Sequence, residues 1–230
     1  MDDPIRYQLY GYPYTRSILT EMVLLECAIS YDVHEVNIFE NQHQADWYIK
    51  INPTGLIPCL ITPQGDTLSE APAINLYLAD LHPESELSPP VDDKQRGEFL
   101  RGLFFLTNEI EPTLKRYFYP HRYARNQAST EQMEQDSLKE VIKLLEQMEA
   151  RLSKKGPYCL GDRYSLVDLT LSFWIIYLEY EPSYAGFSND DYHEEPFQHI
   201  KECVKRVTNR APISAIFREY RNQHKRHLNL

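Results

Sequence analysis

The sequence has no long hydrophobic run and no excess of basic side chains. No apolar stretch in its 230 residues approaches about 18 residues, the length that spans a bilayer as a helix, so no membrane protein is expected. The chain opens with MDDP and lacks the apolar run of a secretory signal. Its formal net charge is −10, and binding to phosphates needs a basic face, so nucleic acid is not an expected partner. An ordinary globular protein of the cytoplasm is expected.

Cysteine pairs and histidine clusters are also missing. The chain has four widely separated cysteines without a CxxC motif, namely Cys27, Cys59, Cys159 and Cys203. We therefore expect reduced, buried thiols. The eight histidines form no group with the spacing of metal ligands, so no metal site is expected.

The first third of the chain alternates strand-like and helical patterns. Residues 5–10 and 31–38 are strand-like, and apolar groups between them recur on one helical face. A small helix within 40–51 is followed by a buried strand (LIPCLIT), a turn (PQGD) and a short returning strand (TL). A helix over 72–81 completes the order βαβαββα, which is typical of a mixed sheet with helices on both faces.

The residues after this first third have apolar patterns that predict helices. A stretch rich in proline and acid predicts a linker over 83–91, between a first domain at 1–82 and an all-helical domain at 92–230. The helix expected at 166–180 is apolar almost all round, so it should be buried. Pro112 should kink the first helix. The expected helices are 94–118, 131–153, 166–180, 196–209 and 212–223.

Two residues before the buried helix have the spacing of a helix cap. In GDRYSLVD, Ser165 and Asp168 are three residues apart at a predicted helix start. Their side chains can cap the helix N-terminus reciprocally, as in a capping box. This motif predicts structure and implies no catalysis.

The loop GYPYTRS, from Gly11 to Ser17, closes the first strand and opens the first helix. It has the shape of a thioredoxin-type C-P-Y-C loop, with Tyr12 and Thr15 at the two cysteine positions. Dithiol redox chemistry and mixed-disulfide chemistry are therefore excluded at this loop. A hydroxyl here can be a simple N-cap, or it can donate to an anion that the helix N-terminus also attracts.

A proline interrupts the apolar strand in NPTGLIPCL. Pro58 removes a ladder hydrogen bond, which is normally tolerated only at edges or special bonds. It is either an edge-strand proline or part of a cis Ile57–Pro58 bond, which would turn the Ile57 N–H and C=O towards a ligand. The surrounding sequence favours the cis bond.

The order and spacing of several stretches resemble the cytosolic glutathione transferase family. These stretches are LYGYPYTRS, NPTGLIPCL, SEAPAINLYLAD, the linker and GDRYSLVDLTLSFW, which together cover essentially the whole chain. The chain is similar to bacterial members of the serine/threonine type. The resemblance implies a thioredoxin-like N-terminal domain that binds glutathione as a co-substrate, and an all-helical domain that binds a small hydrophobic electrophile. It also implies a homodimer with a role in detoxification.

The resemblance further implies which residue holds the glutathione sulfur. Thr15 lies where many members have a serine at the start of the first helix. Its hydroxyl would donate to the thiolate and, with the helix N-terminus, lower the thiol pKa. Tyr10 is an alternative, since it aligns with a strand tyrosine that some classes use, and Ser17 and Tyr14 are further candidates.

The other glutathione contacts are also carried over from the family. Ile57, followed by Pro58, would pair its main chain with the cysteinyl unit. Glu70 would receive the γ-glutamyl ammonium, and His43 the glycine carboxylate. Tyr14 and the main chain of Ala71 complete the expected contacts. The electrophile pocket would be lined by Tyr12 and Tyr119.

One position departs from the family pattern. The usual E-S-x-A-I reads Glu70-Ala71-Pro72-Ala73-Ile74, so the serine hydroxyl that binds the γ-glutamyl carboxylate is missing. A charge-assisted hydrogen bond is worth about 1.5–3 kcal/mol. Leu56 likewise replaces a residue that is often polar. This departure favours the alternative function, a non-catalytic binding protein of the same fold, similar to the bacterial stringent starvation proteins.

Overall fold

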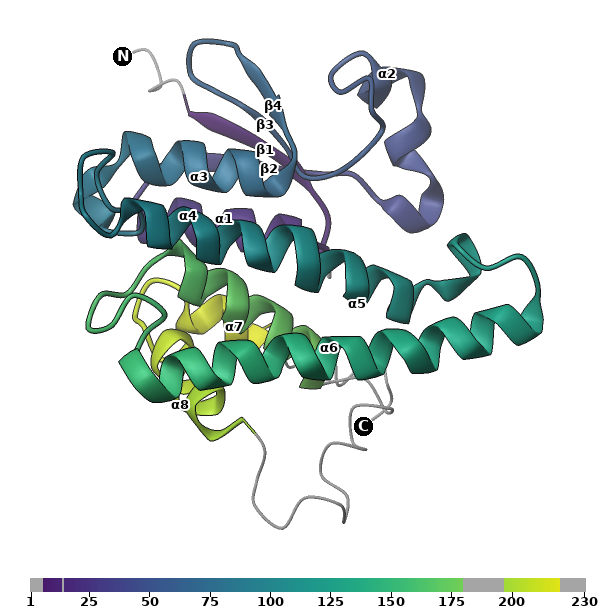
Figure 1. The fold of residues 1–230 in the computed structure, drawn as a ribbon. Helices are drawn as coiled ribbons and strands as arrows, with labels where there is room; N and C mark the ends of the chain where they lie inside the picture. Colours follow the sequence, from purple (N-terminus) through teal and green to yellow (C-terminus); the bar gives the residue numbers. More distant parts are fainter. Residues whose placement is uncertain (1–5, 14, 180–196, 220–230) are drawn as a thin grey trace. The chain divides into compact units, whose positions relative to one another are not determined.

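The computed structural model of the chain describes residues 6–13, 15–179 and 197–219 (Figure 1). The chain divides into two compact units, one formed by residues 1–90 with 208–230 and the other by residues 91–207.

The first unit is built on a four-stranded mixed sheet (Figure 1). The strand order is β2-β1-β3-β4, with β1 parallel to β2 and β3 antiparallel to both β1 and β4. Its main elements are β1 (Tyr7–Gly11), α1 (Ser17–Glu26), β2 (Tyr31–Glu35), α2 (Asp46–Ile49), β3 (Cys59–Ile61), β4 (Thr67–Ser69) and α3 (Ala71–Leu81). The sequence pattern predicts this mixed sheet, and the family resemblance implies its thioredoxin-like arrangement.

The two faces of the sheet are covered by different helices. Successive side chains of a strand point to opposite faces. Gly11 faces α1, because a Cβ built on it would lie 2.5 Å from the Cβ of Ser17. Tyr10 points to the other face and packs against a buried cluster that includes Tyr48 of α2. Helix α3 contacts α1, so these two helices share one face and α2 covers the other.

The second unit is helical. Its elements are α4 (Arg96–Phe105), a π-helix (Leu106–Ile110), α5 (Glu111–Phe118), α6 (Gln127–Lys155), α7 (Leu166–Glu179) and α8 (Gln198–Thr208). Among the described residues after 95, β pairing is limited to isolated bridges within 158–163. Every residue from 164 to 176 is buried, which confirms that α7 is a core helix.

A π-helix lies directly before Pro112, where the sequence predicts a kink. Proline has no N–H to donate to the preceding turn. The chain widens into the π-helix over Leu106–Ile110 and resumes as α5, with Pro112 in its first turn. The hydroxyl of Thr113 donates to the carbonyl of Glu109 at 2.7 Å, which satisfies an acceptor in this region.

The predicted capping box at α7 is present. The Asp168 carboxylate accepts from the N–H of Ser165 at 2.9 Å, and the Ser165 hydroxyl accepts from the N–H of Val167 at 3.3 Å. Asp168 also accepts from the N–H of Cys159 at 2.6 Å. Burial raises the pKa of Asp168, although these hydrogen bonds oppose the shift. The motif therefore fixes both the start of α7 and the loop before it.

The described residues from 208 to 219 belong with the first unit. Arg210 pairs with Glu26 at the end of α1 through two contacts, 2.7 Å from Nε and 2.8 Å from the second nitrogen. Residues 214–219 are helical, within the helix expected over 212–223, whose last residues lie outside the described part. The domain limits at 82 and 92 remain a prediction, and this pairing attaches a late segment to the early unit.

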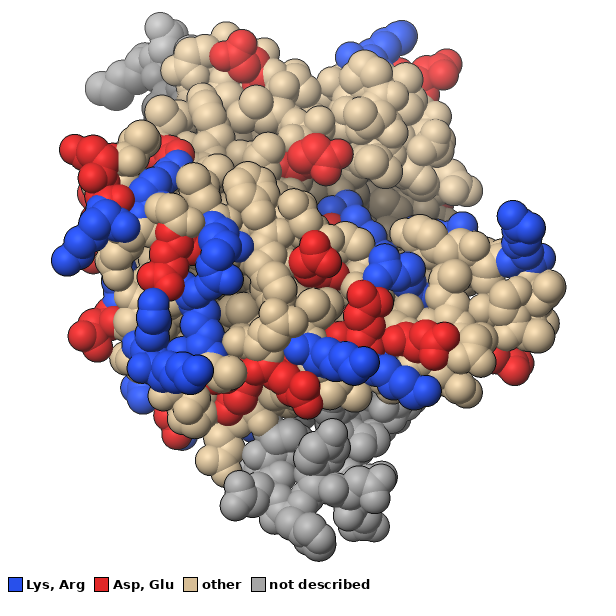
Figure 2. Space-filling model, in the orientation of Figure 1, with Lys and Arg blue, Asp and Glu red and all other residues tan. Residues whose placement is uncertain are grey.

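Charges of both signs lie on the face of the molecule that Figure 2 draws. Figure 2 shows acidic and basic side chains interspersed there. Glu98, for example, pairs with both Arg151 and Lys155 at 2.8 Å. In the described part of the chain, no helix is long and apolar enough to cross a membrane.

The four cysteines are free and buried. Burial raises the pKa of the Cys27 and Cys59 thiols to about 11. Because a protonated thiol is a poor nucleophile, these side chains are unreactive in the folded chain. Their environment agrees with the structural role that their spacing predicts.

Candidate functional site

The loop between β1 and α1 holds a compact group of hydroxyls. The Thr15 hydroxyl donates to the Tyr12 carbonyl at 2.7 Å, and its oxygen accepts from the N–H of Ser17 at 3.2 Å. The Thr15 and Ser17 hydroxyl oxygens are 2.9 Å apart. The N–H of Ile18 donates to the Thr15 carbonyl at 3.2 Å, so Thr15 closes the first turn of α1. The N-cap of α1 is the next residue, Arg16, whose side chain does not cap the helix, so Thr15 lies one residue before the N-cap.

Thr15 is also placed to meet an anion. It is partly exposed, whereas Ser17 is 5% exposed and faces Gly11. Thr15 lies at the positive end of the α1 dipole. A charged acceptor forms a stronger hydrogen bond than a neutral carbonyl. A thiolate at this position could thus accept the hydrogen bond that the Thr15 hydroxyl now donates to the Tyr12 carbonyl, without disturbing the N–H of Ser17.

Tyr10 occupies a packing position. Its ring stacks on His34 with centroids 4.7 Å apart and lies 6.2 Å from the ring of Tyr48. Burial raises the pKa of Tyr10. It lies on the α2 face of the sheet, opposite to the face of Gly11 and Ser17. These contacts favour a packing role, and the choice between Tyr10 and Thr15 remains a prediction.

The NPTG segment is organised by buried donors. The Tyr48 hydroxyl and the Asn52 amide both donate to the Leu56 carbonyl, at 2.5 and 2.7 Å. Asn52 also accepts from the N–H of Thr54 at 3.2 Å. Tyr48 is 0% and Asn52 is 2% exposed, and burial raises the pKa of Tyr48 to about 12, so its hydroxyl stays protonated. The two side chains hold the backbone directly before Ile57.

The main chain of Ile57 is available to a ligand. The Ile57–Pro58 bond is cis, as predicted. Within the described residues, neither the N–H nor the C=O of Ile57 forms a hydrogen bond. Its side chain packs against the cluster around Tyr48. An extended peptide could therefore pair with this backbone, as the resemblance implies.

His43 lies beside the same segment. Gly55 has φ +62°, and a Cβ on it would be 3.1 Å from the His43 carbonyl oxygen and 2.7 Å from the Gln44 amide nitrogen. Glycine thus permits the loop to approach the short helix at Gln42–Gln44. The Nδ1 atom of His43 is buried without a hydrogen-bond partner in the described part of the chain. The contact between His43 and a ligand carboxylate remains a prediction.

Glu70 and Ala71 form the entrance to α3. Glu70 has φ 68°, a left-handed conformation that costs a non-glycine residue of order 1–3 kcal/mol. Its side chain is exposed and does not cap the helix. Ala71, 3% exposed, begins α3 and Pro72 follows in the first turn. Strained backbone of this kind is found at ligand-binding positions, which supports Glu70 as a contact residue.

The remaining predicted residues fall in different places. Tyr12 contacts the ring of Phe39, with centroids 5.9 Å apart. Tyr119 lies in the helical unit, where its hydroxyl is 3.4 Å from that of Tyr177 and Arg122 lies over its ring at 4.3 Å. Tyr14 lies outside the described residues. The joint role of Tyr12 and Tyr119 in one pocket remains a prediction.

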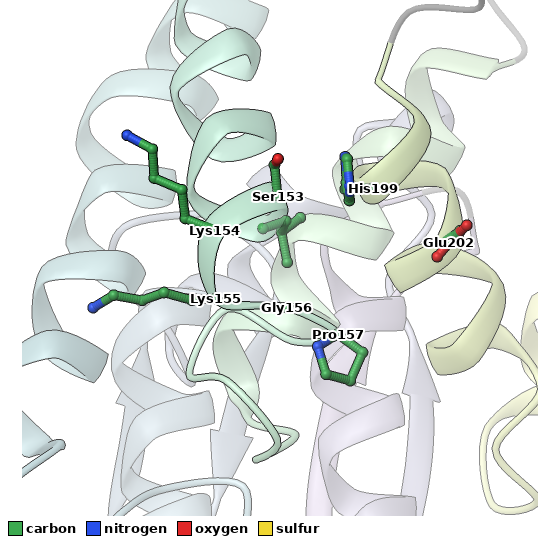
Figure 3. Close-up of a pocket in the computed structure, with 8 residues that line it drawn as sticks. Ser153, Lys154, Lys155, Gly156, Pro157, His199 and Glu202 are labelled. Carbon is green, nitrogen blue, oxygen red and sulfur yellow. The ribbon is translucent and has the colours of Figure 1, made fainter.

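A surface pocket of about 330 Å³ lies elsewhere, in the helical unit. It is formed by the last turn of α6, by Gly156 and Pro157, and by His199 and Glu202 of α8 (Figure 3). The side chains of Lys154 and Lys155 point away from it (Figure 3). None of the residues predicted to bind glutathione or the electrophile lines this pocket.

Two residues of the site were missed by the sequence interpretation. The sequence pattern places Tyr48 in a small helix and Asn52 at the start of the NP-x-G motif. Both hold the Leu56 carbonyl. The NP-x-G signature could have pointed to Asn52, but nothing in the sequence indicates the donor role of Tyr48.

The fold and this site together define a two-domain protein with a thioredoxin-like unit and a helical unit. The N-terminal domain model of the glutathione S-transferases matches residues 16–81, and the C-terminal domain model of the same family matches residues 102–211. The chain belongs to the glutathione S-transferase family.

Relatives of several kinds resemble the chain. The uncharacterized GST-like protein YncG of Escherichia coli K12 is 28% identical over 165 residues, which is 71% of this chain and 78% of that protein. A glutathione transferase structure from Methylococcus capsulatus is 28% identical, with a TM-score of 0.73 over 93% of this chain and 98% of that chain. A Burkholderia graminis glutathione transferase, with two glutathione molecules bound per subunit, is 25% identical, with a TM-score of 0.78 over 94% of this chain and 89% of that chain.

Proposed function

We propose that the protein is a glutathione transferase that joins the glutathione thiolate to a hydrophobic electrophile. The observation that carries the proposal is the partly exposed Thr15 hydroxyl at the N-terminus of α1, in a member of this family. The hydroxyl and the helix dipole both favour a negative charge beside them. They would lower the pKa of a bound thiol and supply a nucleophile at neutral pH.

The chemistry needs no group from the protein beyond this donor. The thiolate sulfur forms a bond to an electrophilic carbon, and the leaving group departs with its electron pair. The proton lost from the thiol goes to solvent when the thiolate forms. Thr15 would stabilise the sulfur anion before attack, as a preorganised donor does in other enzymes.

Binding of glutathione is assigned to three segments of the first unit: the short helix before α2, the loop between α2 and β3, and the residue before α3. The Ile57 main chain would pair with the cysteinyl unit, since the Leu56 carbonyl before it is held by two donors. His43 would meet the glycine carboxylate and Glu70 the γ-glutamyl ammonium. A relative at 25% identity has glutathione bound, which supports the ligand proposed here.

The test is a paired measurement on the full chain. Titration calorimetry measures glutathione binding, and absorbance at the product band measures conjugation with 1-chloro-2,4-dinitrobenzene. We expect both binding and turnover above the uncatalysed rate. Binding without turnover, against this and other electrophiles, would contradict the catalytic proposal.

Ala71 supports a second candidate, a non-catalytic binding protein of the same fold. Its side chain has no hydroxyl for the γ-glutamyl carboxylate at the start of α3. Failure to bind glutathione in the calorimeter would favour this function. A homodimer in the cytoplasm, with a role in detoxification, is proposed from the family resemblance, and sedimentation velocity at micromolar concentration tests the dimer.

A further inference from the structure

An exposed aromatic ring lies beside the Thr15 loop. Phe39 is 71% exposed, although phenylalanine is usually buried. It lies in the short helix Ile38–Glu40 between β2 and α2. Neither the motifs nor the family assignments above give this residue a role.

The backbone around Phe39 is held by side-chain hydrogen bonds. The N–H of Phe39 donates to the Asn37 side chain at 3.0 Å. The N–H of Asn37 donates to the Gln42 side chain at 2.9 Å, and the N–H of Gln42 donates back to the Asn37 carbonyl at 3.0 Å. The exposed position of the ring is therefore set by an ordered turn.

The ring is linked to the proposed sulfur donor through one residue. Phe39 contacts Tyr12 with centroids 5.9 Å apart and an interplanar angle of 69°, an edge-to-face pair. The carbonyl of the same Tyr12 accepts the hydroxyl of Thr15 at 2.7 Å. An electrophile that reacts at a sulfur beside Thr15 would have this aromatic pair close by.

We propose that Phe39, together with Tyr12, binds the ring of the electrophile, and that Phe39 makes the site prefer planar, electron-poor arenes over small aliphatic electrophiles. This inference rests on the proposed function. Aromatic faces carry negative charge density and attract the edges or faces of electron-poor rings. In the reaction the sulfur–carbon bond forms at the ring, and a halide leaves with its electron pair. Phe39 is a specificity-determining residue and takes no part in the proton or electron transfer.

The experiment compares two conjugates that differ only in the group on sulfur. Calorimetry measures the Kd of S-(2,4-dinitrophenyl)glutathione and of S-methylglutathione for the full chain and for Phe39→Ala. We expect Phe39→Ala to weaken binding of the dinitrophenyl conjugate about 3- to 10-fold, the range of an aromatic pair, and to leave the methyl conjugate unchanged. Phe39→Trp should keep the preference.

Val33→Ala is the matched control. Val33 is 47% exposed on the edge strand β2, so the substitution also removes an exposed apolar side chain of the same unit. It should leave both Kd values unchanged. Because the measurement is of binding, it gives a result whether or not the chain turns over a substrate.

Three results would overturn the inference. One is an equal change for both conjugates, which would mean that Phe39 acts on the glutathione part. Another is an unchanged Kd for both conjugates. If Phe39→Ala then also abolishes self-association in sedimentation, the ring is a contact between copies of the chain. The third is a parent chain that binds neither conjugate, in which case the proposed function fails as well. A Phe39-dependent preference for the dinitrophenyl conjugate, without turnover in the conjugation assay, would contradict only the proposed function.

Discussion

Ala71→Ser should restore a missing contact to glutathione. Ala71 is the first residue of α3, and the residue before it makes no side-chain cap. A serine hydroxyl there lies at the positive end of the helix and can donate to the γ-glutamyl carboxylate. A hydrogen bond to a charged group contributes about 1.5–3 kcal/mol, which converts to an affinity gain of about 10- to 150-fold.

Titration calorimetry with glutathione at pH 7 measures this gain. Ala73→Ser is the matched control, because Ala73 is exposed in the same turn of α3. The matched ligand is 4-aminobutyryl-cysteinyl-glycine, which lacks only the γ-glutamyl carboxylate. The gain should vanish with this ligand and with Ala73→Ser.

The reasoning fails under either of two results. One is an unchanged Kd for Ala71→Ser while the thermal midpoint shows an intact fold. The other is an equal gain with the ligand that lacks the carboxylate. Either result would mean that the γ-glutamyl group does not lie at the N-terminus of α3.

Three further predictions concern the scaffold of the site. Tyr48→Phe removes one of two donors to the Leu56 carbonyl. Urea titration should therefore show a free energy of unfolding lower by about 0.5–1.5 kcal/mol, and calorimetry should show a weaker glutathione complex. An unchanged free energy of unfolding would contradict the contact. Gly11→Ala places a Cβ 2.5 Å from the Ser17 Cβ, so the same titration should show a free energy of unfolding lower by about 1–3 kcal/mol. An unchanged free energy of unfolding would refute the close approach. All four cysteines are buried, so an aromatic disulfide reagent should react slowly with the native chain and count four thiols only after unfolding; rapid native reaction would disprove their burial.

Much of the fold could be predicted because it follows from local patterns. The apolar sequence of α7 and the spacing of Ser165 and Asp168 determine a buried, capped helix without reference to distant residues. The π-helix before Pro112 could not be predicted, because the sequence shows only that an N–H is missing and not how the turn adapts. The attachment of the last described segment was also missed, because Glu26 and Arg210 are 184 residues apart and no local pattern links them.

In the candidate site, too, some residues can be predicted from local motifs and others cannot. The motifs that carry the family resemblance identify Thr15, Ile57 and Glu70 as candidate glutathione contacts. The cis bond before Pro58 follows from a proline inside a strand together with that resemblance. The partners of these residues depend on tertiary contacts. Tyr48 reaches the Leu56 carbonyl only because α2 packs over the loop, and Phe39 contacts Tyr12 only once two loops are folded together.

Thr15 is the residue proposed to stabilise the glutathione thiolate. The direct measurement is the ultraviolet thiolate absorbance of the glutathione complex against pH, for the parent chain, Thr15→Ala and Tyr10→Phe. In the parent the bound thiol should ionise below about 8.5, the usual pKa of a thiol. Thr15→Ala should raise this pKa and cut turnover about 10- to 1,000-fold with little effect on binding, whereas Tyr10→Phe should change neither. Loss of the thiolate signal in Tyr10→Phe, with the signal intact in Thr15→Ala, would contradict the account and assign the role to the tyrosine.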